Sequence, residues 1–140
     1  MRTLLVPIDG SASGNRAVAH AVDSAQRLGD VKLLLLNVQP TLERGYPGGL
    51  LSPEVRERLQ QAAQADAAAA LALTDAAHLS YEFLVAFGQP AEVITRIAEE
   101  RGCAGIVMGT RGLSEWANVL LGSTAFRVVQ QSSLPVTLIH

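Results

Sequence analysis

Glycine and hydroxyl residues near the end of the chain form the pattern with the clearest chemical meaning. Gly-Thr-Arg-Gly occupies residues 109–112, and Gly-Ser-Thr follows at 122–124 after nine intervening residues. The first glycine follows an apolar run at 106–108, typical of a buried strand, and the last glycine opens a helical stretch. Glycines at a strand end let a ligand approach the backbone, and a helix start offers N–H groups to an anion. The spacing therefore predicts a site for the phosphate groups of a nucleotide.

The helix start supplies several weak contacts to an anion. The N–H groups of Ser123, Thr124 and Ala125 precede the first helical hydrogen bonds, and the helix dipole favours negative charge there. One such contact contributes only about 0.3–1 kcal/mol when exposed, so we expect several to converge. Gly109 and Gly112 can adopt positive φ, which lets a ligand approach the backbone closely. No Walker-type motif or general base accompanies these residues, and the histidines lack ligand spacing, so no catalytic residue and no metal site are predicted.

The composition indicates a cytoplasmic protein with an aliphatic core. The 140 residues are predicted to form a single domain over 1–140, with 49% hydrophobic but only 4% aromatic residues. The net charge of −2 argues against a nucleic-acid partner, which usually meets a basic surface. A lone cysteine, Cys103, excludes an internal disulfide and suggests a reducing compartment. No apolar run approaches the roughly 18 residues that span a membrane, so we expect no membrane partner.

Strand-like and helix-like segments alternate along the chain. Strands are predicted at residues 3–8, 31–38, 79–87, 105–108 and 136–139, and helices at 13–28, 52–77, 90–101 and 123–130. Ser13 is the predicted cap of the first helix, and residues 39–51 form a long loop, either a lid or a disordered tip. This alternation is typical of an α/β fold with a doubly wound parallel sheet and helices on both faces. Ligands of such sheets bind at the carboxyl ends of the strands, so Asp9 and Gly109 line one crevice if their strands are neighbours.

The glycine spacing also carries a resemblance to a known family. Gly-x2-Gly-x9-Gly-Ser at residues 109–123 resembles the ATP-binding pattern of the universal stress protein family. Residues 4–11, 88–90 and 134–139 resemble the opening strand and turn, the mid-chain segment and the closing strand of that family, so the likeness extends over the whole chain. It implies a five-stranded parallel sheet of order 3-2-1-4-5, with ATP or another adenine nucleotide held where the strand order reverses.

Matching positions imply which residues hold the nucleotide. Pro7 and Asp9 would line the adenosine end, and Val38 would meet adenine through its backbone. The segment 109–115 would wrap the ribose and phosphates, and the helix start would hold the phosphate chain. The implied site consists of Pro7, Asp9, Val38, Gly109, Thr110, Arg111, Gly112, Leu113, Ser114, Glu115, Gly122, Ser123, Thr124 and Ala125.

Several positions depart from the family pattern. Asn37 stands where a histidine is common, Gly105 stands where an aspartate is common, and Ala125 lacks a hydroxyl that some ATP-binding members carry nearby. Glu115, beside Trp116, either repels a triphosphate or helps to hold a divalent cation such as Mg²⁺. An adenine nucleotide is therefore better supported than a preference for ATP over ADP or AMP.

Three functions fit these observations. The first is a nucleotide-binding regulatory protein of the stress-response type that is not an enzyme and forms a homodimer. The apolar strand at residues 136–139 motivates the homodimer, because an open apolar edge favours association. The second is a slow ATPase or another adenylate-handling enzyme, since related folds host such chemistry. The third is a protein-interaction module whose nucleotide site is vestigial.

Overall fold

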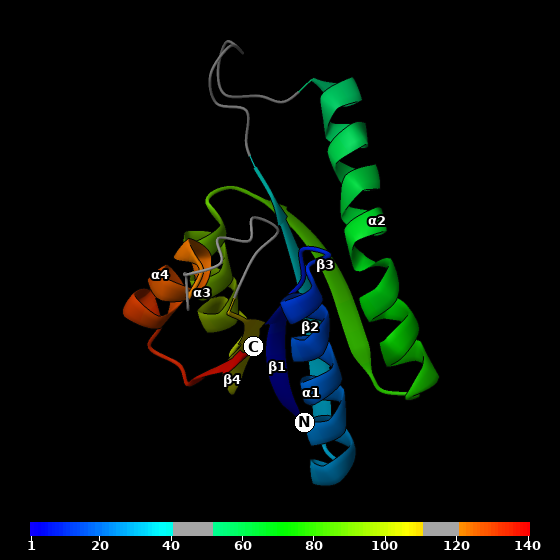
Figure 1. Ribbon diagram of the computed structural model, residues 1–140, viewed down its shortest axis with the longest axis vertical. Coiled ribbons are helices and arrows are strands. Elements are labelled where there is room, and N and C mark those ends of the chain that lie inside the picture. The colour runs from blue at the N-terminus through cyan, green and yellow to red at the C-terminus, as the bar shows by residue number, and fades with distance from the viewer. Residues whose placement is uncertain (41–51, 111–120) are drawn as a thin grey trace.

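The computed structural model shows a parallel sheet with helices against both of its faces (Figure 1). It describes residues 1–40, 52–110 and 121–140. The strands are β1 (Arg2–Pro7), β2 (Val31–Gln39), β3 (Tyr81–Phe87), β4 (Gly105–Gly109) and β5 (Val136–Ile139). The helices are α1 (Ala12–Leu28), α2 (Pro53–Ala76), α3 (Pro90–Glu100) and α4 (Ser123–Gln131). The five strands run parallel in the order β3-β2-β1-β4-β5, which confirms the predicted fold class and strand order.

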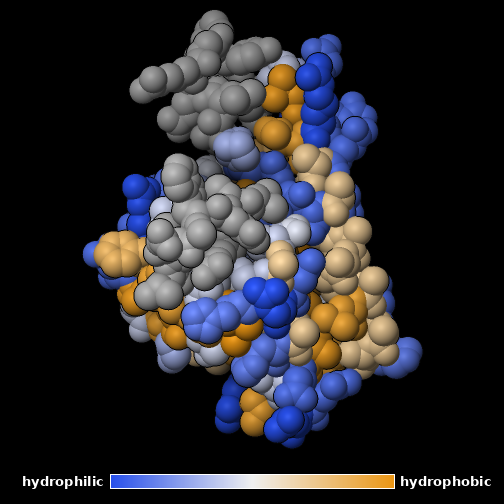
Figure 2. Space-filling view, in the orientation of Figure 1, coloured by the Kyte–Doolittle hydropathy of each residue, from blue (hydrophilic) through white to orange (hydrophobic). Residues whose placement is uncertain are grey.

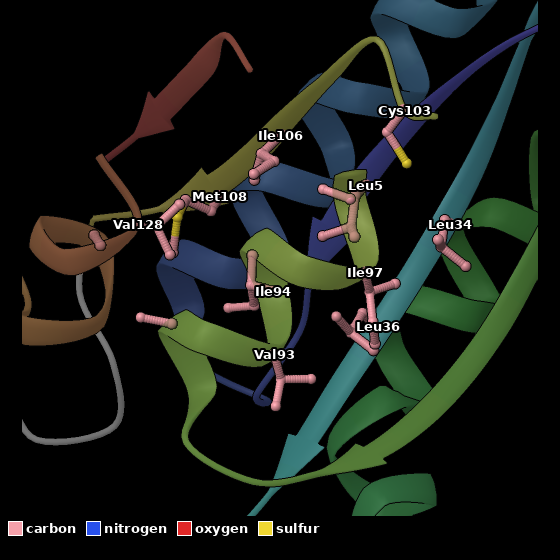
Figure 3. Close-up of a cluster of buried hydrophobic side chains, with 13 residues drawn as sticks. Leu5, Leu34, Leu36, Val93, Ile94, Ile97, Cys103, Ile106, Met108 and Val128 are labelled. Atoms are coloured by element: carbon pink, nitrogen blue, oxygen red, sulfur yellow. The ribbon is translucent and has the colours of Figure 1, made fainter. Parts of the chain in front are cut away.

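Each face of the sheet carries its own aliphatic core. Leu5, Leu34 and Ile106 belong to the core cluster that residues of α3 and α4 complete (Figure 3). Leu33 and Leu35 belong to the opposite core, which α1 and α2 cover. Successive residues of a strand point to opposite faces, so the uninterrupted leucine run of β2 supplies both cores. No helix in the described part of the chain is long and apolar enough to cross a membrane.

Two predicted boundaries are wrong for local reasons. Helix α1 is capped by Ser11, whose Oγ accepts the N–H of Gly14 at 3.1 Å, whereas Ser13 lies buried in the first turn. Ser11 has the extended torsion angles that an N-cap residue requires. Strand β3 begins at Tyr81, two residues later than predicted, because the chain first leaves α2 through His78 at a left-handed φ of 54°.

Cys103 lies in the core between the sheet and α3, where only 4% of its surface is exposed. Burial raises the pKa of its thiol and outweighs the opposing influence of the nearby Arg101. Because the thiolate is the reactive form, we expect the native protein to resist a thiol-specific reagent at mildly alkaline pH. The guanidinium-unfolded chain should react fully in the same colorimetric assay. Rapid labelling of the native protein would contradict this assignment of Cys103 to inert packing.

Candidate nucleotide site

The carboxyl ends of β1 and β4 lie next to each other at the centre of the sheet. Strand β1 pairs with β2 on one side and with β4 on the other, so the strand order reverses between β1 and β4. Asp9 follows β1 and Thr110 follows β4, at the same edge of the sheet. The predicted adjacency of these strands is therefore confirmed, and it places the two loops at the position where parallel α/β sheets bind ligands.

The turn after β1 is held by its own side chains. Asp9 Oδ1 accepts the N–H of Ser11 at 2.9 Å, and Gly10 adopts a left-handed φ of 83°. Asp9 therefore stabilises the local turn through its own side chain. Asp9 is nevertheless only half-buried, as are Pro7 and Val38, so all three remain available to a ligand.

Gly109 is required by helix packing rather than by its own torsion angle. A Cβ atom there would lie 2.6 Å from the Ser13 carbonyl carbon and 2.7 Å from the Gly14 nitrogen. Among the described glycines, positive φ occurs at Gly10, Gly29, Gly88 and Gly102, so Gly109 does not use the positive φ that is open to a glycine. The first turn of α1 packs so closely against the end of β4 that no side chain fits between them. This contact brings the two loops of the crevice together.

The start of α4 lies against the end of β4. The N–H of Gly122 donates to the Thr110 carbonyl at 2.5 Å, and the N–H of Thr110 donates to the Ile139 carbonyl at 2.9 Å. Gly122 is the N-cap residue with no side-chain cap bond, so Ser123 is the first helical residue rather than the cap. Ser123 is exposed and Thr124 is half-buried, which leaves this helix start accessible to an anion.

Ala125, the third residue of α4, can contribute to this helix start only through its backbone. The side chain of Ala125 is 2% exposed and belongs to the core beneath α3 and α4. Only its backbone N–H can therefore serve a ligand, and a missing hydroxyl at this position costs the site nothing. The predicted role of Ala125 is compatible with its burial.

Two residues near the crevice were missed by the sequence reading. His140 follows β5, and its Nδ1 lies 3.5 Å from Thr110 Oγ1. Arg16 on α1 donates from Nε to the His140 carbonyl. Arg16 thus brings a cation to the residue that follows β5. The signal for His140 was its place after the last strand, at the same edge of the sheet as Asp9 and Thr110.

Two buried amides beneath the β1 turn were also missed as a group. Asn37 Nδ2 donates to the Ile8 carbonyl at 2.8 Å, and Gln39 Nε2 donates to Asn37 Oδ1 at 2.6 Å. Both amides also reach Asp66 Oδ2 on α2, each at 3.5 Å. The available signal was a pair of polar residues at alternate positions that ends the leucine run of β2.

Part of the predicted site lies outside the described residues. This applies to Arg111, Gly112, Leu113, Ser114 and Glu115, to the neighbouring Trp116, and to positions 41–51 of the predicted loop. The described members of the site come from the ends of β1, β2 and β4 and from the start of α4. Within the described ranges, no group of three or more His, Cys, Asp or Glu residues could hold a metal ion.

A second concavity lies between α2 and the edge strand β3, away from the glycine motif. It has a volume of about 490 Å³ and is lined by Glu57, Gln60, Gln61, Gln64, Phe83 and Val85. In Figure 2 much of the exposed surface of α2 has apolar colours, in keeping with its many alanines. The polar wall of this groove consists of amides and one carboxylate, and none of the described residues of the phosphate motif or of the strand switch point lines it.

The comparisons with known proteins agree with this architecture. The model of the universal stress protein family matches residues 1–140. The chain belongs to the universal stress protein family. A universal stress protein of Thermus aquaticus, named for the region downstream of a sulfhydrylase gene, is 34% identical over 139 residues. That alignment covers 99% of this universal stress protein and 98% of its relative.

Three solved structures place this universal stress protein among known folds. A hypothetical protein of Methanocaldococcus jannaschii gives a TM-score of 0.83 at 24% identity, over 99% of this chain and 94% of that chain. A universal stress protein in complex with cAMP gives 0.77 at 25% identity, over 99% and 97% of the two chains. A universal stress protein of Archaeoglobus fulgidus in complex with dAMP gives 0.74 at 22% identity, over 100% and 98%. The first and third likenesses, below 25% identity, show the fold alone.

Proposed function

We propose that this universal stress protein binds an adenine nucleotide across the carboxyl ends of β1 and β4 and acts as a nucleotide-responsive regulator. The observation that carries the proposal is the hydrogen bond between Gly122 and Thr110, which sets an uncapped helix start beside the strand switch point. Such a helix start favours an anion, and the switch point favours a ligand that lies across two loops. The relative solved with cAMP supports adenine as the base.

The ligand would lie with its adenosine end over β1 and β2 and its phosphates toward α4. Pro7, Asp9 and the backbone of Val38 would contact the adenosine. Gly109 and the 110–115 segment would follow the ribose and first phosphate, and residues 122–125 would bind the phosphate chain. ATP with Mg²⁺, ADP and AMP all present the group that this helix start recognises, so the proposal covers adenine nucleotides as a class.

Regulation rather than catalysis is proposed from the chemistry of the described site. Efficient hydrolysis needs a group that orients water against the terminal phosphate. Asp9 Oδ1 is already engaged by the Ser11 amide, and the start of α4 contributes hydroxyl and N–H groups without a base. Sustained release of inorganic phosphate from ATP, well above that of a Gly122→Val variant, would favour the enzyme alternative.

Native mass spectrometry and thermal unfolding together test the nucleotide proposal. Freshly purified protein should carry or accept an adenine nucleotide that is identified by mass after denaturation. Addition of AMP, ADP or ATP at about 100 times its dissociation constant should raise the free energy of unfolding by about 2.7 kcal/mol. Unchanged melting with all three nucleotides, with and without magnesium, would instead favour a vestigial site in an interaction module.

We also propose a cytoplasmic homodimer that pairs through β5. This strand is at the edge of the sheet, and its Val136 and Leu138 are half-buried while Thr137 between them is exposed. On the neighbouring α4, Phe126 is 51% and Val129 is 47% exposed. An open edge beside apolar side chains favours association with another strand. Multi-angle light scattering at micromolar concentration should give twice the chain mass of 14.8 kDa, and a monomer would exclude this dimer.

A further inference from the structure

Two polar side chains end the otherwise aliphatic strand β2. Asn37 is 1% exposed and Gln39 is 7% exposed. They point to the face that α1 and α2 cover, whereas Val38 between them packs against the opposite core. A buried amide costs free energy unless its polar atoms find partners, so an apolar pair would suit the core more simply. The pair lies at the carboxyl end of a central strand, next to the candidate nucleotide site rather than deep in the core.

The amides link three segments that are far apart in the sequence. Asn37 Nδ2 donates to the Ile8 carbonyl at 2.8 Å, just beyond the end of β1. Gln39 Nε2 donates to Asn37 Oδ1 at 2.6 Å, and both amides lie 3.5 Å from Asp66 Oδ2. Asp66 belongs to the middle of α2. The end of β1, the end of β2 and α2 are therefore joined by one polar network.

The same network touches both neighbours of Asp9. Ile8 precedes Asp9 and is bonded by Asn37. Gly10 follows Asp9 and rests on α2, because a Cβ atom there would lie 3.4 Å from both Asp66 Cα and Asp66 Oδ1. Gly10 also has the left-handed φ of 83°, so the direction of the turn is fixed at this contact. The backbone position of Asp9 is thus restrained by contacts of both neighbouring residues.

We propose that Asn37, Gln39 and Asp66 are positioning residues of the nucleotide site, which fix the Asp9 turn for the adenosine end of the ligand. This inference rests on the proposed function and adds α2 to the elements that build the site. A turn already fixed in its binding geometry loses less conformational freedom when the ligand arrives, which strengthens binding without a direct contact. Loss of this network should weaken the contacts to the adenosine part of the ligand, because the phosphates would bind separately at the start of α4.

The test compares Asp66→Ala, Asp66→Asn and the matched control Asp75→Ala. Asp75 also lies on α2, and its Oδ1 accepts the Tyr81 hydroxyl at 2.7 Å, so the control loses a contact between α2 and the sheet far from the site. Alanine is the best helix former, so both alanine variants should fold. Dissociation constants for AMP and adenosine are measured by calorimetry or NMR titration on each full-length variant.

Asp66→Ala should weaken AMP and adenosine binding equally, by about fivefold, so the ratio of the two affinities stays unchanged. Asp66→Asn retains a carbonyl acceptor and should restore binding to within about twofold of the native protein, and Asp75→Ala should do the same. Equal AMP affinity in native protein and Asp66→Ala would overturn the positioning role alone. An equal loss in Asp75→Ala would also overturn it, since any loosening of α2 would then suffice. If the native protein binds no adenine nucleotide, the proposed function falls together with this inference.

Discussion

Gly109→Ala is expected to destabilise the fold by about 3 kcal/mol, at the upper end of what overpacking costs. The added Cβ would meet backbone atoms of Ser13 and Gly14 at 2.6 and 2.7 Å, and it would also meet Ser13 Oγ. A side chain could turn away, but backbone atoms in the first turn of a helix move only if α1 shifts as a whole. Urea unfolding followed by circular dichroism measures the loss.

Gly29→Ala is the control for this substitution. Gly29 has a positive φ of 85°, but a Cβ there meets nothing within 4 Å. Its cost should therefore be limited to backbone strain, about 1 kcal/mol. If Gly109→Ala were no more destabilising than Gly29→Ala, the close packing of α1 on β4 would not be the reason for a glycine at the start of the motif.

Gly122→Val should abolish nucleotide binding while the protein remains folded. Gly122 has extended torsion angles of −65° and 158°, which valine adopts without strain, so the cost to stability is that of a poorer N-cap, about 1 kcal/mol. A branched side chain beside the first N–H groups of α4 would exclude the phosphates from the helix start. Isothermal titration with ATP should show no saturable heat for this variant.

Side chains of increasing size at position 122 test whether steric exclusion of the phosphates causes the loss of binding. Gly122→Ala adds only one methyl group at the same N-cap position, so its affinity should fall between those of the native protein and Gly122→Val. Circular dichroism and thermal unfolding establish that each variant is folded before titration. A folded Gly122→Val with undiminished ATP affinity would remove the start of α4 from the site.

The fold could be predicted because its signals are local. The apolar run of β2 and the periodic apolar face of α3 each identify an element without reference to the rest of the chain. The position of Ser11 as the cap was missed because Ser11 and Ser13 are both good N-cap residues, and only the torsion angles distinguish them. The strand order came from the family resemblance rather than from these local signals.

The site could be predicted only in outline. The glycine motif indicated phosphate chemistry, but the reason for Gly109 lies in α1, about one hundred residues away in the sequence. The Asn37, Gln39 and Asp66 network was missed because its bonds join residues separated by 27 and 29 positions. From the sequence alone, a polar pair at the end of a strand is expected to be exposed to solvent. Only the packing of α2 against the sheet shows that this pair is buried.

Amide NMR mapping tests the central claim most directly, because it locates the ligand on the folded native protein. A ¹⁵N-labelled sample titrated with AMP should show saturable shifts at Asp9, Gly10, Thr110 and residues 122–125. The amides at the opposite end of the sheet should not move, for example Asp30 before β2 and Arg101 after α3. Absence of any saturable shift, or shifts confined to the groove between α2 and β3, would contradict a nucleotide site at the ends of β1 and β4.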